Sequence, residues 1–338
     1  MKALVRICLP LCIFSFIAFG LTCIFLPREG NADRGETSYT FEESFDNIRV
    51  ETGSYDLTIA PWSESYTSVD VDEEIKDRVL VNLDGDTLVI TSRFNFDWFR
   101  IGNYNLAEWL GRLVNGELFN EQVTVKVPEK TYEKLELNCT SGSISSEFVA
   151  AKDVSLRLTS GSVDYYQPTG HKADRIDLHE TSGSATLKNA MTDEYSVHIT
   201  SGEAMIYSLT GKGRVEMTSG DALLEYAELN GDCYLKTTSG RIDVKIPDDS
   251  SAVISPSVTS GMLYVNVGGV EAIGDSLSSG QNIKLGSGKY NITAKMTSGS
   301  IDIFGLESSE NSAAATTGSF AEAYDDVIAE QTENGTTD

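Results

Sequence analysis

Hydrophobic and polar residues alternate in short runs along most of this chain, and the runs end at a recurring triplet, Thr-Ser-Gly or Ser-Ser-Gly. The triplet begins at Thr140, Thr159, Thr181, Thr200, Thr218, Thr238, Thr259, Ser278 and Thr297. Successive copies lie 19, 22, 19, 18, 20, 21, 19 and 19 residues apart. A strand-rich repeat of just under 20 residues predicts a β-solenoid, in which each repeat forms one coil.

The residues around the triplet show how each coil is built. One, three and five positions before it, the residues are mostly apolar, as with Leu135, Leu137 and Cys139 before Thr140. This period of two predicts a strand with one buried face. After the triplet, apolar residues resume at even positions, as Val163 and Tyr165 do after Thr159. The chain should therefore turn a corner at the triplet, where Gly adopts angles that other residues avoid.

These patterns together predict an all-β fold, a single elongated parallel β-solenoid of about nine coils marked by Thr-Ser-Gly corners. At about 4.8 Å per coil the stack would be roughly 40 Å long, and we expect a right-handed coil. No histidine accompanies the triplet consistently. Its serine is therefore interpreted as a corner residue and not as a nucleophile.

The chain divides into four segments. Residues 1–30 form an N-terminal start and apolar segment, residues 31–127 an N-terminal coil and cap region, and residues 128–304 the solenoid repeats. Residues 305–338 hold eight acids and no Lys or Arg, which predicts a disordered acidic tail.

Two strand patterns precede the repeats. The stretch 48–61 reads as an earlier coil with Thr52-Gly53-Ser54 at its corner, and 79–92 reads as a hairpin that turns at Asp84-Gly85.

The segment 94–119 interrupts these patterns with aromatic residues and predicts a short helix near 105–114. An open solenoid end exposes apolar core and strand edges, so covering that end is the favoured role for this insert. The alternative is an interaction surface, for which Trp98, Phe99 and Trp109 are the candidate residues.

The N-terminus predicts export. Lys2 and Arg6 precede an uncharged apolar stretch at 7–26, long enough for a transmembrane helix. We expect a single-pass membrane anchor with the N-terminus in the cytoplasm and the repeats outside the cell membrane. Cleavage of a signal near Gly30-Asn31-Ala32, with secretion of the rest, is the alternative.

Charge and cysteine content exclude some functions. The 338 residues include 26 basic and 51 acidic side chains, a formal net charge of −25. Nucleic acid is not an expected partner, because the chain would repel polyanions. Outside the apolar stretch there are two cysteines, Cys139 and Cys233. They fall in coils too far apart for a disulfide, so we expect free thiols.

The apolar N-terminus, the strand-like stretch 123–137 and the recurrent Thr-Ser-Gly strands together resemble the bacterial putative-adhesin family of repeated β-strands, the domain of unknown function 4097 type. The resemblance covers roughly residues 40–304. It implies a surface or sensing role and no catalytic motif, so no site residues carry over from the family.

One candidate constellation is a row of polar residues on the outer face. His179 and His198 each stand two positions before their triplets, and Glu216 is next in that column. They should stack at one strand spacing, which would allow a shared metal. Without further ligands, a row of surface residues is the favoured interpretation, and no metal or cofactor is expected.

The acidic residues of the repeats give two further hypotheses. Glu180 falls in a buried column, where it should protonate, reach solvent or find hydroxyl partners, with a local bulge in the 22-residue coil as the favoured outcome. Asp164, Asp243 and Asp302 share one repeat position but belong to coils three or four apart in sequential order. They should therefore be too distant for acid–base catalysis.

The sequence accordingly predicts a non-enzymatic, exported, membrane-tethered surface interaction or scaffold module. Its partner would be a cell-envelope protein or a glycan. An envelope-stress sensor that binds a wall component or a protein is the alternative, and a polysaccharide-acting enzyme comes third.

Overall fold

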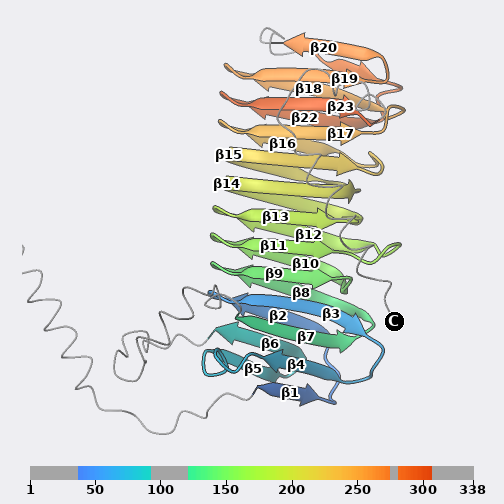
Figure 1. The fold of residues 1–338 in the computed structure, drawn as a ribbon. Helices are drawn as coiled ribbons and strands as arrows, with labels where there is room; N and C mark the ends of the chain where they lie inside the picture. Colours follow the sequence, from blue (N-terminus) through green and yellow to red (C-terminus); the bar gives the residue numbers. More distant parts are fainter. Residues whose placement is uncertain (1–36, 93–120, 275–280, 307–338) are drawn as a thin grey trace, which may run out of the picture. The chain divides into compact units, whose positions relative to one another are not determined.

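The computed structural model describes residues 37–92, 121–274 and 281–306, which form strands β1 to β23 (Figure 1). No helix within these ranges is long and apolar enough to cross a membrane. The predicted anchor at 7–26 lies outside the described residues. The described chain is all-β, as the alternating pattern predicts, and falls into two compact units, Met1–Tyr165 and Tyr166–Asp338.

The first unit is built from the N-terminal strands. They are β1 (Ser38–Phe41), β2 (Asn47–Thr52), β3 (Asp56–Trp62), β4 (Thr67–Val71), β5 (Val79–Asp84), β6 (Thr87–Ser92), β7 (Gln122–Pro128), β8 (Thr131–Cys139), β9 (Ser143–Glu147), β10 (Ala150–Leu158) and β11 (Ser162–Tyr166).

The second unit holds the remaining strands. They are β12 (Ala173–Glu180), β13 (Ser184–Lys188), β14 (Thr192–Leu209), β15 (Lys212–Tyr226), β16 (Cys233–Thr237), β17 (Arg241–Ile246), β18 (Ala252–Val258), β19 (Met262–Val267), β20 (Val270–Gly274), β21 (Ile283–Leu285), β22 (Tyr290–Met296) and β23 (Ser300–Gly305).

Within the second unit, neighbouring coils pair in parallel with the register that the columns predict. Ile176 lies opposite Tyr195, Tyr195 opposite Gly213, and Gly213 opposite Cys233. Ile176, Tyr195 and Cys233 of this column are buried and Gly213 is half-buried, while the residues on either side of them are exposed or half-buried. The strands therefore form solenoid-like coils around an apolar interior.

The order of the coils differs from their order in the sequence. The last coil, β22 and β23, pairs with β16 and β17 on one side and with β18 and β19 on the other (Figure 1). The outer edges of β18 and β19 are occupied by β21 and β20, both antiparallel. Each strand has only two edges, so the last coil fits only on the side of β18 and β19 that faces β16 and β17.

The coil predicted around Ser278 is not formed. Its flanking strands β20 and β21 pair antiparallel as edge strands, and Ile273, assigned to a buried column, is 65% exposed. Residues 275–280, with this triplet, lie outside the described residues. β20 has 5 residues and β21 has 3, and such short edge strands leave little exposed sheet edge with which another chain could pair.

In the first unit, the predicted early coil is confirmed. β2 pairs in parallel with both β6 and β8, and β3 with both β7 and β9. The hairpin of β5 and β6 is present too, but Asp84 pairs with Thr87, so its turn residues are Gly85 and Asp86, one position later than predicted. β5 pairs antiparallel with β6, and β4 pairs antiparallel with β7, so they occupy the edges of β6 and β7 that the coils leave free.

The corner glycines are required for a reason other than the one expected. Of the described triplet glycines, only Gly220 has a positive φ, at 101°. What most of them share is a close approach to the neighbouring coil, as found at Gly142, Gly161, Gly202, Gly220, Gly240, Gly261 and Gly299. A Cβ at Gly161 would lie 2.3 Å from the carbonyl oxygen of Gly142, and one at Gly240 would lie 2.4 Å from that of Gly220. Crowding between coils therefore selects glycine at these corners.

Three substitutions separate crowding from backbone strain. Gly142→Ala should destabilise the chain by about 2–3 kcal/mol, because its Cβ would lie 2.1 Å from the carbonyl oxygen of Tyr55. Gly220→Ala combines crowding with positive φ and should cost more. Gly170→Ala, at φ +81° with nothing within 4 Å, should cost only about 1 kcal/mol. Urea unfolding measures all three. Wild-type stability of Gly142→Ala would contradict the crowding argument.

Candidate functional site

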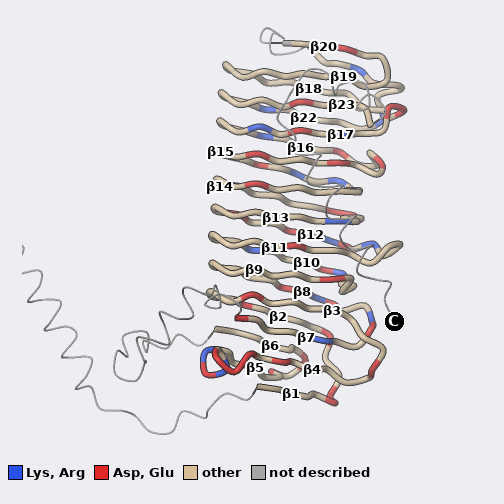
Figure 2. Tube along the Cα trace, in the orientation of Figure 1, with Lys and Arg blue, Asp and Glu red and all other residues tan. Residues whose placement is uncertain are grey.

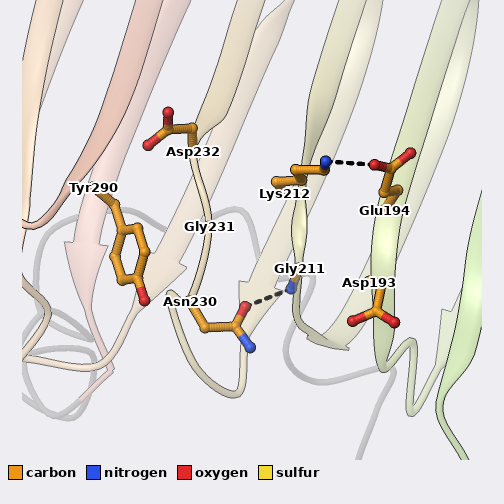
Figure 3. A pocket seen from close by; sticks show the side chains of 8 residues that line it. All are labelled: Asp193, Glu194, Gly211, Lys212, Asn230, Gly231, Asp232 and Tyr290. Atoms are coloured by element: carbon orange, nitrogen blue, oxygen red, sulfur yellow. Dashed lines mark hydrogen bonds and ion pairs between the residues drawn. The ribbon is translucent and has the colours of Figure 1, made fainter.

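An open polar groove of about 530 Å³ crosses the strand starts of the second unit (Figure 3). It is lined by Asp193, Glu194, Gly211, Lys212, Asn230, Gly231, Asp232 and Tyr290. These residues come from β14, the turn before β15, β15, the loop before β16, and β22. The Tyr290 ring forms the wall opposite Asp193 and Glu194 (Figure 3).

The groove is held by hydrogen bonds between neighbouring coils. The Gly211 amide donates to Oδ1 of Asn230 at 2.6 Å, and Lys212 Nζ lies 2.5 Å from Oε1 of Glu194. The hydrogen bond between the side chains of Lys212 and Glu194 lowers the pKa of Glu194 and raises the pKa of Lys212. Asp232 Oδ1 accepts from the Asn291 amide at 2.8 Å. Such a surface offers donors and acceptors to a polar ligand.

A second feature lies on the same strands, around Tyr234. Arg214 and Lys295 lie over its ring, 5.3 and 5.4 Å from the centroid. Lys295 is there because β22 pairs with β16. Elsewhere along the strands, Asp and Glu are more frequent than Lys and Arg (Figure 2).

The predicted histidine stack is confirmed. His179 lies opposite His198, with ring centroids 4.8 Å apart and planes within 5° of parallel. Glu216, next in the row, forms an ion pair with Arg214. Within the described ranges no group of three or more His, Cys, Asp or Glu side chains is placed to hold a metal ion.

Glu180 is buried, but its strand is regular. Its register with β14 is continuous from Ala173 to Glu180, so the expected bulge is absent, and the extra residues of this coil lie in the loop at 167–172. Oε1 accepts hydrogen bonds from the backbone amides of Gly183 and Glu203, each at 3.0 Å. Its partners are therefore backbone amides and not the hydroxyl groups that the sequence suggested. Oε2 is buried without a partner, and burial raises the pKa of this carboxyl.

Two of the three repeat aspartates are direct neighbours, contrary to the prediction that all three lie too far apart. Asp243 lies opposite Asp302 because β23 pairs with β17. Burial, together with the charge of Asp302, raises the pKa of Asp243 to about 6. Burial also raises the pKa of Asp302, against the lowering effect of Arg241. The sequential coil order assumed from the sequence concealed this pair.

Both cysteines of the described chain are free and buried, as expected. Cys233 accepts hydrogen bonds from the hydroxyls of Tyr195 and Tyr226 at 3.1 and 3.2 Å inside the second unit. Gly213 leaves room for the Tyr195 ring, since a Cβ there would lie 2.5 Å from Cδ2. Burial raises the pKa of both thiols, so neither is activated.

The sequence pattern missed the groove. Asn230, Gly231 and Asp232 lie between strands, outside the aligned columns, and Tyr290 belongs to a coil that is distant in sequence. The Asn-Gly dipeptide was the one available signal for a turn there. The candidates Trp98, Phe99 and Trp109 lie outside the described residues.

The fold and this site define a solenoid-like β-repeat protein with an exposed polar surface. The chain belongs to the Toastrack DUF4097 family, which it matches over residues 45–304, and this confirms the resemblance drawn from the repeats. No curated protein matches it.

Several solved structures are similar to this chain. One is a putative adhesin of Bacteroides fragilis NCTC 9343, with 10% identity, coverage of 79% of this chain and 95% of that one, and a TM-score of 0.45. Another is a putative lipid binding protein of Parabacteroides distasonis ATCC 8503, with 18% identity, coverage of 82% and 99%, and a TM-score of 0.44. A putative cell adhesion protein of Clostridium sporogenes ATCC 15579 has 12% identity, coverage of 79% and 98%, and a TM-score of 0.26.

Glu180→Gln should flatten the dependence of stability on pH. A carboxyl whose pKa is raised on folding stabilises the folded state below its unfolded pKa, here 4.5, and this is lost as the pH rises through the folded value. The variant keeps the acceptor for both amides. The free energy of unfolding of the variant should exceed that of the wild type by about 1 kcal/mol at pH 8, and this difference should disappear at pH 4. Urea unfolding at both pH values measures this difference, with Glu147→Gln, at an exposed position, as the control. An equal dependence of stability on pH in all three proteins would contradict the prediction.

Cys139 and Cys233 should both be protected from a thiol reagent in the folded chain. The experiment uses a background of Cys8→Ser, Cys12→Ser and Cys23→Ser. Because both thiols are buried, reaction should follow global unfolding, and intact mass should show no disulfide. Rapid labelling of either thiol under native conditions would show that its coil opens locally.

Proposed function

We propose that this chain is a non-enzymatic interaction module of the cell envelope. Residues 7–26 would anchor it in the membrane, and the β-repeats would bind an envelope polymer or protein on the outer side. Membership of the Toastrack DUF4097 family, and the resemblance of the repeats to the putative-adhesin family, support a binding role.

The observation that carries this proposal is the groove. Its lining offers carboxylates, an ammonium group, an amide and a phenol along successive coils. Polar groups repeated at strand spacing are suited to an extended ligand that runs along the stack. The lining contains no serine, cysteine or histidine, so it cannot form the Ser–His or Cys–His pair of nucleophilic acyl transfer.

The paired aspartates do not favour the enzyme alternative. Glycoside hydrolysis needs two carboxyl groups at least about 5 Å apart, so that the scissile bond lies between them. Asp243 and Asp302 face each other on adjacent strands and interact by a side-chain hydrogen bond. This leaves no room for a sugar linkage between the two carboxyls.

The test is co-sedimentation of the full chain, in detergent, with the envelope fraction of the cells that produce it. The wild type should sediment with the fraction. The double variant Lys212→Ala, Tyr290→Ala should lose about tenfold in affinity if the groove holds the ligand. The matched control is Lys188→Ala, Tyr166→Ala, a Lys–Tyr pair with Nζ 4.8 Å from the ring centroid outside the groove.

Absence of wild-type binding would overturn the proposed function. Equal binding by all three proteins would show that the groove does not hold the ligand. Release of soluble sugar from the envelope fraction would support an enzyme instead.

A further inference from the structure

A second surface of the second unit combines acidic and apolar side chains. It lies on the outer face of β17, β23 and β19, after the corners. Along one row, Asp243 lies opposite Asp302, and Asp302 lies opposite Tyr264. The same row reaches Ile273 on β20, opposite Tyr264. This surface, here called the acid–aromatic face, exists because the last coil lies between two earlier ones.

The two carboxyls of this face are poorly neutralised. Arg241 Nε lies 3.9 Å from Asp302 Oδ2, and the arginine side chain is 60% exposed whereas that of Asp302 is 19% exposed. Lys245, on the same strand, points toward Glu225 of β15 at 3.7 Å. Asp221 of β15 adds further negative charge near Asp243. When both are ionised, two half-buried acids side by side repel each other, so a cation bound against the pair would be stabilised.

The apolar part of the face lies directly beside this pair. Tyr264 and Phe304 are in contact, with ring centroids 5.4 Å apart. Met262 and Ile273 are 51% and 65% exposed, and they are two of the four exposed large hydrophobic residues in the described ranges. Ser300 and Asn266 add hydrogen-bonding groups opposite Met262 and Phe304.

We propose that the acid–aromatic face binds a polymer of amino sugars. An ammonium group of the ligand is held by Asp243 and Asp302, beside the ring of Tyr264, which also attracts cations. The flat apolar side of a sugar ring packs on Tyr264, Phe304 and Ile273. Sugar hydroxyls bond to Ser300 and Asn266. The proposal rests on the proposed function and names the ligand class for a second surface of the same module.

Charge complementarity favours this occupant. The chain carries a net charge of −25, so a cationic polymer is attracted at long range and an acidic one is repelled. A cationic peptide shares the ammonium group but lacks a rigid ring that could pack on the exposed apolar side chains. It is therefore the competing outcome of the experiment.

The experiment measures binding of β-linked glucosamine oligomers to the full chain in detergent by calorimetry. N-acetylglucosamine oligomers of equal length and a lysine peptide are the comparison probes. The glucosamine oligomer should bind at least about tenfold more tightly than either. Equal binding of the acetylated oligomer, or tighter binding of the peptide, would overturn the proposal.

Variants locate the site. Asp302→Asn and Tyr264→Ala should each weaken binding by about three- to tenfold. Asp164→Asn is the matched control, since Asp164 is half-buried at the same repeat position in the first unit, and Tyr234→Ala is the control on β16, before the corner and outside the acid–aromatic face. Both controls should bind as the wild type does. Thermal melts establish that each variant is folded. If Asp302→Asn and Tyr264→Ala are folded and bind with wild-type affinity, the ligand does not bind at the acid–aromatic face.

The pH profile separates a ligand site from a structural role. Because the pKa of Asp243 is about 6, the pair gains negative charge between pH 5 and pH 7. The amine of the oligomer loses protons over the same range with every variant, so the measurement is the affinity of the wild type relative to that of Asp243→Asn. This ratio should rise by about tenfold from pH 5 to pH 7, and a ratio that stays constant would exclude the pair. If the envelope fraction binds but the oligomer does not, this inference fails while the proposed function stands.

Discussion

Contact between the corner glycines is the constraint on which the coils depend. At Gly161, Gly240 and Gly299 the backbone of one coil comes so close to the next that a Cβ would lie 2.2–2.4 Å from a neighbouring glycine carbonyl. At this distance the backbone ladder continues through the corner, as in the 3.1 Å bond from the Ser162 amide to the Gly142 carbonyl. A side chain there would separate the coils and break that ladder. The repeat therefore conserves glycine within one chain through a contact between coils.

Features that depend only on strand period and coil spacing could be predicted from the sequence. Residues of one column lie opposite each other, as Leu137 and Leu156 do, because the same corner sets the register of every coil. The stacked rings of His179 and His198 follow from that register alone. The state of Glu180 could not be derived, because its partners are backbone amides of Gly183 and Glu203, which no side-chain pattern reveals.

The order of the coils is a different kind of information. The stretches that form β18 and β22 carry the same alternation and the same triplet, so these patterns do not show which of the two pairs with β16. The order depends on which strand edges stay free, and β20 and β21 decide this by occupying the outer edges of β19 and β18. Pairs across the inserted coil, such as Asp243 with Asp302, were therefore hidden, although each residue had been assigned to the correct row.

The fold itself does not require acids at this position. Other coils of the second unit carry Thr186, Met205 and Leu223 in the same row, and they pair with equal regularity. Replacing either aspartate with such a residue would remove a like-charge repulsion without disturbing a corner. Stability alone therefore gives no reason for two half-buried carboxyls to face each other. Their placement beside Tyr264 is explained when the negative charge serves a ligand that the free protein lacks.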